Sequence, residues 1–463
     1  MAEKTFRNDL TEGSVAGKLL RFSLPLFASN ALQAIYNIVD MIVVGQVMGK
    51  EGMAGVSIGG DILMFLTAIS FGFSGAGQII IAQNVGAKRY DDVKKIIGTL
   101  FSFLFIVSLS LTVICLVLRY KMLEWISTPA DAFVESYNYT LTCAFGLFFI
   151  YGYNVVSAIL RGMGDSKRPF TFVAIAAVIN AGLDVLFVVV FKWHAFGAAL
   201  ATVIGQGTSF VFSLVYLYKH KEAFGFDFKL SSFRMSGEHL KTILSLGIPM
   251  AIQTAAISFS RLIVGRWING FGSVAAAVTG IYHKSCRIVT LFATAFNTSG
   301  GSMVGQCIGA EKYDRVKKVV YTVFAMMLSV SVVIIAAFYF FPAQIFRIFT
   351  SDEEVIIAAL PLVWPMIFYT LGSAGRAPSF ALINGSGFAA LNFTIAILDG
   401  LVCRLSLSYL FAFVLEKGAY GCWLGDGLSG FVPFLVGFVY FLSGTWRTNK
   451  FLLKRQMGKQ NKG

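Results

Sequence analysis

Two aspartates buried in long apolar stretches are the side chains of this sequence best placed to do chemistry. Asp40 and Asp184 each stand inside a stretch long enough to cross a bilayer, and Asn180 lies four residues before Asp184. Residues four apart share a helix face, so Asn180 projects beside Asp184, and Tyr36 projects beside Asp40. Burial disfavours an ionised carboxylate, whereas a bound proton or Na⁺ relieves that cost. The pattern therefore predicts a site for H⁺ or Na⁺.

A simpler role for these carboxylates is to accept hydrogen bonds between packed helices. An ionisable side chain costs about 2.5 to 3.5 kcal/mol at the centre of a membrane helix, which favours a functional role for Asp40 and Asp184. Asp61 lies near the start of the apolar stretch 57–82, at the expected outer end of that helix, where its side chain can reach the membrane interface. The functional and structural interpretations both stay open for Asp61.

The elements that carry these residues are membrane helices. Of the 463 residues, 56% are hydrophobic and 13% are charged, with a mean hydropathy of +0.73, so the chain is far more apolar than soluble proteins. A membrane-spanning helix needs about 20 apolar residues. Twelve stretches qualify: 18–46, 57–82, 97–118, 133–160, 170–191, 196–218, 242–268, 274–304, 317–341, 356–383, 391–415 and 420–443.

Lysine and arginine are concentrated in both tails and in every second connection between these stretches, except the connection between 356–383 and 391–415, which has none. Basic loops stay on the cytoplasmic side of a membrane, so both termini are expected in the cytoplasm. The expected location is the inner (cytoplasmic) membrane of the cell. These basic loops then face the anionic inner leaflet of the membrane. This explains the net charge of +14 without a nucleic-acid partner, and none is expected.

A repeated sequence divides the chain into two halves. The stretch QNVGAKRYDDVKK at 83–95 returns, nearly unchanged, as QCIGAEKYDRVKK at 306–318. Other matched pairs are Pro25 with Pro249, Gly162 with Gly385, Gly164 with Gly387 and Gly197 with Gly421. Six crossings per half give both halves the same orientation. We predict an all-α polytopic membrane protein of twelve transmembrane helices in two parallel six-helix bundles.

This division gives four expected regions: an N-lobe, a cytoplasmic linker, a C-lobe and a basic cytoplasmic tail. They cover residues 1–218, 219–241, 242–443 and 444–463. Two such lobes facing each other around a midplane cavity are the architecture that alternating access requires.

Motifs typical of membrane enzymes are missing from the sequence. There is no HExxH, GxSxG or P-loop, and the four histidines are scattered. The six cysteines form no CxxC pair and lie mostly in apolar stretches, which is typical of small core residues. We expect a protein that is not an enzyme and needs no cofactor beyond a coupling ion.

The chain resembles the multidrug and toxic compound extrusion (MATE) transporters over nearly its whole length. The resemblance rests on LLRFSLPLFASNALQAIYNIVDMIVVG, the paired loops above, ILRGMGDSKRP, INAGLDVLFV and GAALATVIGQ. It implies a two-lobed antiporter that exports a substrate in exchange for Na⁺ or H⁺. In the DinF-like branch, the conserved polar cluster matches Asp40, Asn180, Asp184 and Thr202, which would also hold Na⁺. Pro25 matches the proline at which the first helix of that branch bends.

The second half departs from the family pattern. NorM-like members carry acids in the stretches that correspond here to 242–268 and 356–383, and this chain has none in either. Its apolar stretches instead contain six basic residues against Asp399 and Asp426. We expect some of these cations to bind an anionic or carboxylate-bearing substrate, the candidates being Lys284, Arg287, Arg376 and Arg404. The alternative is internal pairing, for example of Arg404 with Asp399, and Arg266 and Arg261 could instead reach the interface by snorkelling.

Three transport functions compete for this architecture. An ion-coupled exporter of small molecules fits twelve spans with none left over, whereas a lipid-linked precursor flippase should carry extra helices or a lateral groove. A channel is disfavoured because no filter-like loop or carboxylate ring is present. The expected partners are a small-molecule substrate and membrane lipid, and the protein is expected to be a monomer.

Overall fold

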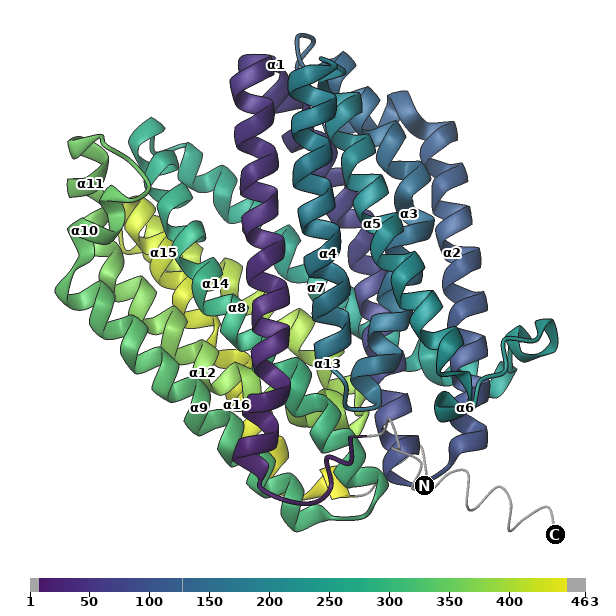
Figure 1. The fold of residues 1–463 in the computed structure, drawn as a ribbon. Helices are drawn as coiled ribbons and strands as arrows, with labels where there is room; N and C mark the ends of the chain where they lie inside the picture. The colour runs from purple at the N-terminus through teal and green to yellow at the C-terminus, as the bar shows by residue number, and fades with distance from the viewer. Residues whose placement is uncertain (1–7, 127, 448–463) are drawn as a thin grey trace. The chain divides into compact units, whose positions relative to one another are not determined.

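The computed structural model describes residues 8–126 and 128–447, and these are folded almost entirely as helices. The expected basic tail lies, from residue 448 onward, outside the described residues. The helices of the first half follow in chain order as α1 (Val15–Gly86), α2 (Tyr90–Trp125), α3 (Phe133–Gly162), α4 (Lys167–Asp184), α5 (His194–Lys219) and the short α6 (Lys221–Phe224). Figure 1 shows α2, α3, α4 and α5 lying side by side.

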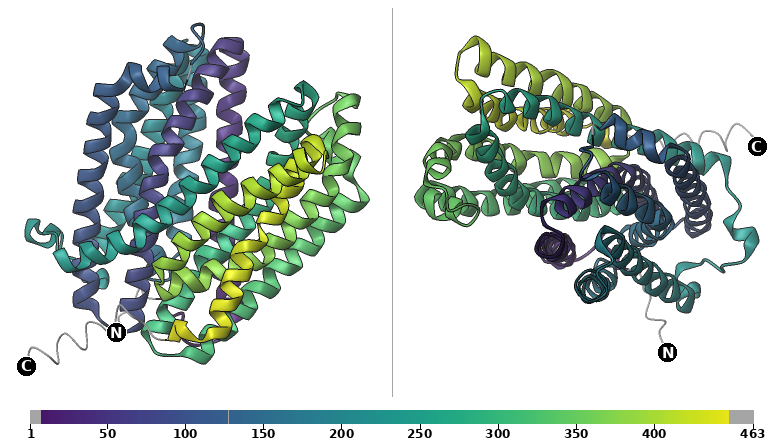
Figure 2. Two further views of the ribbon diagram at one scale, coloured as in Figure 1. Left: turned by 180° about the vertical axis from the view of Figure 1, so that it is seen from behind. Right: turned by 90° about the horizontal axis from the view of Figure 1, so that it is seen from above.

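The second half repeats this order with shorter pieces. Its helices are α7 (Gly237–Asn269), α8 (Ser273–Gly309), α9 (Tyr313–Phe340), α10 (Pro342–Arg347), α11 (Glu353–Ala359), α12 (Val363–Ser386), α13 (Ala389–Ile395), α14 (Arg404–Tyr409), α15 (Gly418–Ser429) and α16 (Phe431–Ser443). The α12 helix packs against α8, α9, α15 and α16, so it lies at the centre of this bundle. Figure 2 shows these green and yellow helices from two further sides.

The prediction of an all-α, twelve-helix membrane protein is confirmed. Eleven helices of the described chain are long and apolar enough to span a membrane. Two of them are the halves of α1, which bends at Gly49, where φ is 63°. The twelfth expected span is α8, whose 37 residues exceed the length of a bilayer crossing. It carries the basic residues His283, Lys284 and Arg287.

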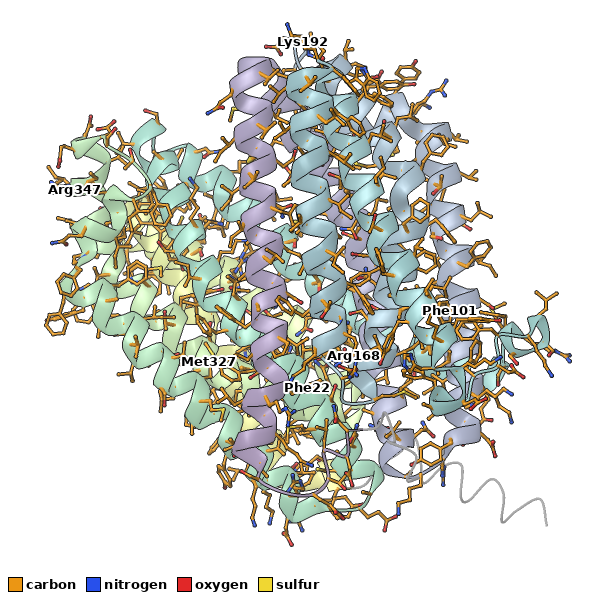
Figure 3. The ribbon with its side chains drawn as sticks, in the orientation of Figure 1. Phe22, Phe101, Arg168, Lys192, Met327 and Arg347 are labelled. Carbon is orange, nitrogen blue, oxygen red and sulfur yellow. The ribbon has the colours of Figure 1, made fainter. Side chains whose placement is uncertain are left out.

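The chain forms two compact units that exchange the first turns of their first helices. Leu24–Gly247 belongs to one unit, whereas Leu10–Ser23 groups with the chain from Ile248 onward. Pro25 and Pro249 therefore both lie just past a point at which the chain passes from one unit to the other. In α1, Phe22 packs in the same buried cluster as Met327 of α9, and both are labelled in Figure 3.

Arg315 attaches the segment before α1 to the second unit. Its guanidinium donates to the backbone carbonyls of Leu10, Glu12 and Gly13 at 3.1, 2.7 and 2.8 Å. Gln306 accepts a hydrogen bond of 3.0 Å from the amide of Leu10. Because both residues belong to the repeated stretch 306–318, this repeat binds the chain just ahead of the first membrane helix.

The segment before α7 is attached to the first unit in a comparable way. Asp227 pairs with Lys94 at 3.4 Å, and the hydroxyl of Ser102 donates to the carbonyl of Phe233 at 2.5 Å. Phe101, labelled in Figure 3, stacks at 6.4 Å on Phe226. The linker is thus folded onto α2, the helix that begins in the first copy of the repeat.

The backbone itself shows the register of the two halves, because residues with positive φ recur at matching positions. The pairs are Lys88 with Glu311 (57° and 58°), Gly164 with Gly387 (86° and 74°), Lys192 with Glu416 (55° and 52°) and His194 with Gly418 (53° and 58°). In the first two pairs, the two members are the same number of residues apart along the chain. In the last two pairs, the members are one residue further apart.

The second half therefore contains one extra residue between Gly387 and Glu416. A π-helical segment, Ala396–Cys403, lies in that interval, whereas the corresponding part of the first half is the α-helix α4. A π-turn accommodates one more residue than an α-turn. The extra residue thus lies in or just before this segment, and from Arg404 onward the longer spacing applies.

Candidate functional site

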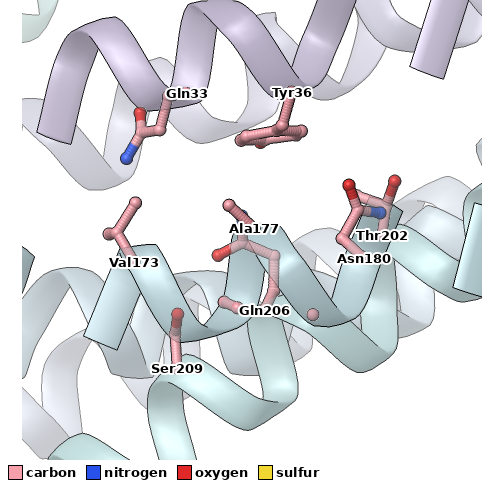
Figure 4. A pocket seen from close by; sticks show the side chains of 10 residues that line it. Gln33, Tyr36, Val173, Ala177, Asn180, Thr202, Gln206 and Ser209 are labelled. Atoms are coloured by element: carbon pink, nitrogen blue, oxygen red, sulfur yellow. The ribbon is translucent and has the colours of Figure 1, made fainter. Parts of the chain in front are cut away.

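A small polar cavity lies inside the first unit, between α1 on one side and α4 and α5 on the other. Figure 4 shows Gln33 and Tyr36 on α1 facing Val173, Ala177 and Asn180 on α4, and residues of α5 close the cavity. Its lining residues are Gln33, Tyr36, Val173, Ala176, Ala177, Asn180, Thr202, Gly205, Gln206 and Ser209. Three of the five residues predicted for cation coupling therefore line one cavity.

The two predicted carboxylates lie beside this cavity and are almost fully buried. Asp40 is 6% exposed and Asp184 is 0% exposed. The two carboxyl groups interact electrostatically with each other, and Tyr36 interacts with both. The structure thus brings Asp40, Asp184, Asn180, Thr202 and Tyr36 together from three helices.

Several polar atoms at this site have no hydrogen-bond partner in the protein. They are Oδ1 of Asp40, both carboxylate oxygens of Asp184 and both side-chain atoms of Asn180. A buried polar group without a partner costs about 1 to 3 kcal/mol, and more if charged. A proton, a cation or ordered water must therefore complete the site.

The helix geometry changes at Asp184. Asp184 is the last residue of α4, and the chain continues as a π-helical segment over Val185–Val190. Single π-helical turns inside α-helices are frequent at functional sites. On α1, Tyr36 lies one turn before Asp40, so both side chains point toward the cavity side.

The oxygens of the site fit a hard cation such as Na⁺. Carboxylate, amide and hydroxyl oxygens are the ligands that such ions prefer, and Asp40, Asp184, Asn180 and Thr202 supply all three kinds. Within the described chain, no group of three or more His, Cys, Asp and Glu could hold a metal ion. The site therefore suits a proton or an alkali cation better than a transition metal.

Sequence reasoning missed three polar residues that line the cavity, Gln33, Gln206 and Ser209. Helical spacing contains the signal for two of them. Gln33 lies three residues before Tyr36, and Gln206 lies four residues after Thr202, so each shares a face with a predicted residue.

A second polar site, in the other unit, is a network of arginines and aspartates. Arg404 donates to Asp399 at 2.8 Å and also to Asp426. Arg376 donates to the other oxygen of Asp399 at 2.8 Å. The hydroxyl of Tyr282 donates to Asp426 at 2.9 Å. These contacts join α8, α12, α14, α15 and the π-helical segment Ala396–Cys403.

Arg261 completes this arginine network, with Nε 3.9 Å from Oδ1 of Asp426. The sequence analysis named snorkelling to the interface as one role for this residue. In the structure, its charge instead joins a cluster of three arginines and two aspartates with a formal net charge of +1. The Nε atoms of Arg261, Arg376 and Arg404 are buried without hydrogen-bond partners.

The four predicted substrate-binding cations occupy different environments. The Arg404 side chain is 0% exposed, so it takes the internal pairing that was the alternative prediction. The Arg376 side chain is 14% exposed and can present part of its guanidinium to a ligand. Lys284 and Arg287 are exposed on α8 and stand apart from the ion pairs of the network, although Lys284 lies 5.8 Å from the ring of Phe349.

Pro25, the predicted hinge, lies inside α1 without interrupting it. The proline removes one backbone hydrogen bond from the helix, which weakens it locally. Its position beside the boundary between Ser23 and Leu24 places this weak point where the chain leaves one unit for the other.

The chain matches the model of a known protein family. The MatE family model matches it twice, over residues 25–186 and 249–410. The chain belongs to the MatE family. MatE proteins are transporters and not enzymes. The two matched ranges are equal in length and begin at Pro25 and Pro249, which confirms the internal repeat.

The first MatE relative matches along nearly its whole length. The chain is 28% identical over 433 residues to the probable multidrug resistance protein YoeA of Bacillus subtilis, covering 92% of this chain and 94% of YoeA. It superposes with a TM-score of 0.89 on a MOP superfamily transporter from Pyrococcus furiosus, described as having a binding pocket of reverse polarity. That likeness has 20% identity and covers 97% of this chain and 100% of the other.

A second solved structure gives the same fold. It is the outward-facing conformation of a multidrug resistance MATE family transporter, with a TM-score of 0.88 at 20% identity. The match covers 95% of this chain and 97% of that one. The twelve-helix, two-repeat arrangement is therefore that of a MATE transporter.

Proposed function

We propose that the protein is an ion-coupled antiporter that exports small organic molecules across the cell membrane, binding H⁺ or Na⁺ at Asp40 and Asp184. The observation that carries this proposal is the set of buried oxygens at this site that have no partner in the protein. A purely structural carboxylate would accept hydrogen bonds from neighbouring helices. Asp184 accepts none, so its stability inside the membrane depends on a bound proton or cation.

Cation binding changes the charge of the site and can therefore drive transport. With H⁺ or Na⁺ bound, the carboxylates are neutralised and the site is stable in a low-dielectric environment. Without it, the two negative charges favour exposure to water. Alternating access between the two lobes then couples release of the cation on one side to export of substrate. Multidrug resistance is the activity named for relatives such as YoeA.

For the substrate, the second unit favours an anion or a carboxylate-bearing molecule. Its buried network carries a net positive charge, and the partly exposed guanidinium of Arg376 can bind a carboxylate through two parallel hydrogen bonds. Lys284 and Arg287 add exposed positive charge on α8. The Pyrococcus furiosus transporter with a pocket of reverse polarity is a precedent within the same fold.

A lipid-linked precursor flippase is the alternative function. The described chain contains the twelve membrane helices expected of an exporter, whereas a flippase should carry extra helices. Multidrug resistance relatives such as YoeA also match the chain over nearly their whole length. These observations support the exporter.

Transport into proteoliposomes tests both parts of the proposal. Efflux of labelled substrates is measured with an imposed H⁺ or Na⁺ gradient, for matched panels of organic anions and lipophilic cations. Gradient-driven transport that is lost in D40N and D184N, and kept when the exposed Asp61 is changed in D61N, supports the coupling site. Transport unaffected by either substitution would exclude these carboxylates as the coupling groups. Transport of cations alone would exclude the anionic substrate.

A further inference from the structure

The repeat register relates the arginine network of the second unit to the cation site of the first. From Arg404 onward the halves keep the spacing that separates His194 from Gly418, so Arg404 corresponds to Asn180 and Asp426 corresponds to Thr202. Packing supports this register, because Gly197 contacts Phe187 and Gly421 contacts Phe411, the matching residues.

The two acids of the first site have neutral counterparts in the second unit. Asp184 corresponds to Ser408, whose hydroxyl donates to the carbonyl of Cys422 at 3.2 Å. Asp40 corresponds to an aliphatic residue, since Pro25 aligns with Pro249 and Gly49 with Gly272, which leaves Ile263 or Val264 at this position. The second unit therefore contains no copy of the carboxylate pair proposed to bind the exchangeable cation.

A guanidinium occupies the matching place in the second unit. In the first unit, Asn180 and Thr202 line one cavity. Their counterparts, Arg404 and Asp426, are joined directly by an ion pair, so the Arg404 side chain crosses the space that is a cavity in the first unit. Asp399, on the π-helical segment whose counterpart in the first half is α-helical, supplies the second carboxylate at 2.8 Å.

We infer that the Arg404 guanidinium is a resident cation: it fills, in the second unit, the position that corresponds to the exchangeable cation of the first, and it prevents the second unit from binding H⁺ or Na⁺. This inference rests on the proposed cation site at Asp40 and Asp184. Arg404 acts as a residue that determines coupling specificity, because it leaves the transporter with one exchangeable cation site. Its full burial and its two carboxylate partners explain why no free cation replaces it.

Removing the guanidinium should convert Asp399 and Asp426 into a site for a free cation. The test uses the full-length protein in detergent with D40N/D184N, which removes the cation response of the first unit. Arg404→Ala is added to this background. Thermal stability is then measured at constant ionic strength with Na⁺, K⁺, methylguanidinium or, as the inert reference, choline, each at pH 5.5 and pH 8.

The expected result is a melting temperature that rises with one of these cations, or with protons, by roughly 3 °C at about 100 times its dissociation constant. The background variant without Arg404→Ala should show no such rise. Arg266→Ala, an exposed arginine on α7, is the matched control and should also show none. A folded R404A variant whose melting temperature is the same in all cations and at both pH values would overturn the inference.

A second variant covers the case in which R404A does not fold in choline. Arg404→Asn with Asp426→Thr restores the residue types of the first unit and removes one positive and one negative charge together. Recovery of folded R404A by Na⁺, K⁺, methylguanidinium or low pH would support the inference. If R404N/D426T folds but none of these conditions recovers R404A, Arg404 is structural and the inference fails.

The result of this test can be distinguished from a failure of the proposed coupling site in the first unit. The cation response of the first unit is read in the otherwise unaltered protein, and that of the second unit is read where Asp40 and Asp184 are already neutral. Loss of the first response would contradict the proposed coupling site without changing the second measurement.

Discussion

Arg376 of α12 donates a 2.8 Å hydrogen bond to Asp399, which lies on a π-helical segment 23 residues further along the chain. The same carboxylate also accepts a hydrogen bond from Arg404, so removing Arg376 leaves Asp399 paired.

Replacing Arg376 by glutamine should weaken anion binding more than it weakens the fold. The substitution lowers the net charge of the network from +1 to zero, while Asp399 keeps Arg404. We expect loss of anion-dependent thermal stabilisation and a decrease of about 1 to 3 kcal/mol in the free energy of unfolding. Thermal shifts against organic anions measure both. Arg266→Gln is the control, and unchanged anion shifts in R376Q would remove Arg376 from the substrate site.

Replacing Asp184 by asparagine should stop transport while leaving the fold intact or slightly more stable. Both carboxylate oxygens of Asp184 are buried without partners, so a neutral amide costs less there than a charge. We expect gradient-driven efflux at the level of empty vesicles and a gain of about 1 kcal/mol in unfolding free energy. A melting temperature that drops sharply in D184N would show that Asp184 holds helices together instead.

Replacing Arg315 by alanine should release the segment before α1 from the second unit. One guanidinium holds three backbone carbonyls there, which a lysine ammonium cannot match in geometry. We expect faster amide exchange over residues 10–14 and a loss of about 1 to 3 kcal/mol, with Arg315→Lys recovering only part of it. Exchange measured by mass spectrometry tests this. The exposed Lys318→Ala should leave exchange unchanged; equal effects at both positions would contradict a specific role for Arg315.

The linker before α7 should show an acid-sensitive attachment through Asp227. The hydroxyl of Ser232 donates to this carboxylate, and with help from Lys229 and Lys94 it lowers the pKa of Asp227 to about 2. A lowered carboxyl pKa means that this stabilisation is present above the ordinary value of 3.8 and is lost as the pH falls toward about 2.

Amide exchange in the linker, compared at pH 5 and pH 2.5, measures this attachment after correction for intrinsic rates. We expect protection over residues 228–236 to fall at the lower pH in the unaltered protein. In Asp227→Asn, protection should already be reduced at pH 5 and should change little with pH. The same pH dependence in both proteins would mean that another group controls the linker.

Much of the fold followed from the sequence because its signals are local. Span lengths, basic loops and the copied stretch at 306–318 depend on one segment at a time, and they predicted twelve helices in two halves. The coupling site was also local in part, since Asn180 and Asp184 share a helix face by spacing alone. The resemblance to MATE transporters added Thr202, which lies on a different helix.

Pairings between helices were decided only by the tertiary structure. Three arginines and two aspartates allow many combinations, and only packing placed Arg404 between Asp399 and Asp426 and turned Arg261 toward the same cluster. Helical periodicity assigns a side chain to a face but does not say which helix covers that face. The matched glycines allowed the extra residue anywhere between Gly387 and Gly421, and only the backbone conformation placed it in or just before Ala396–Cys403, so that Arg404 stands where the first half has Asn180.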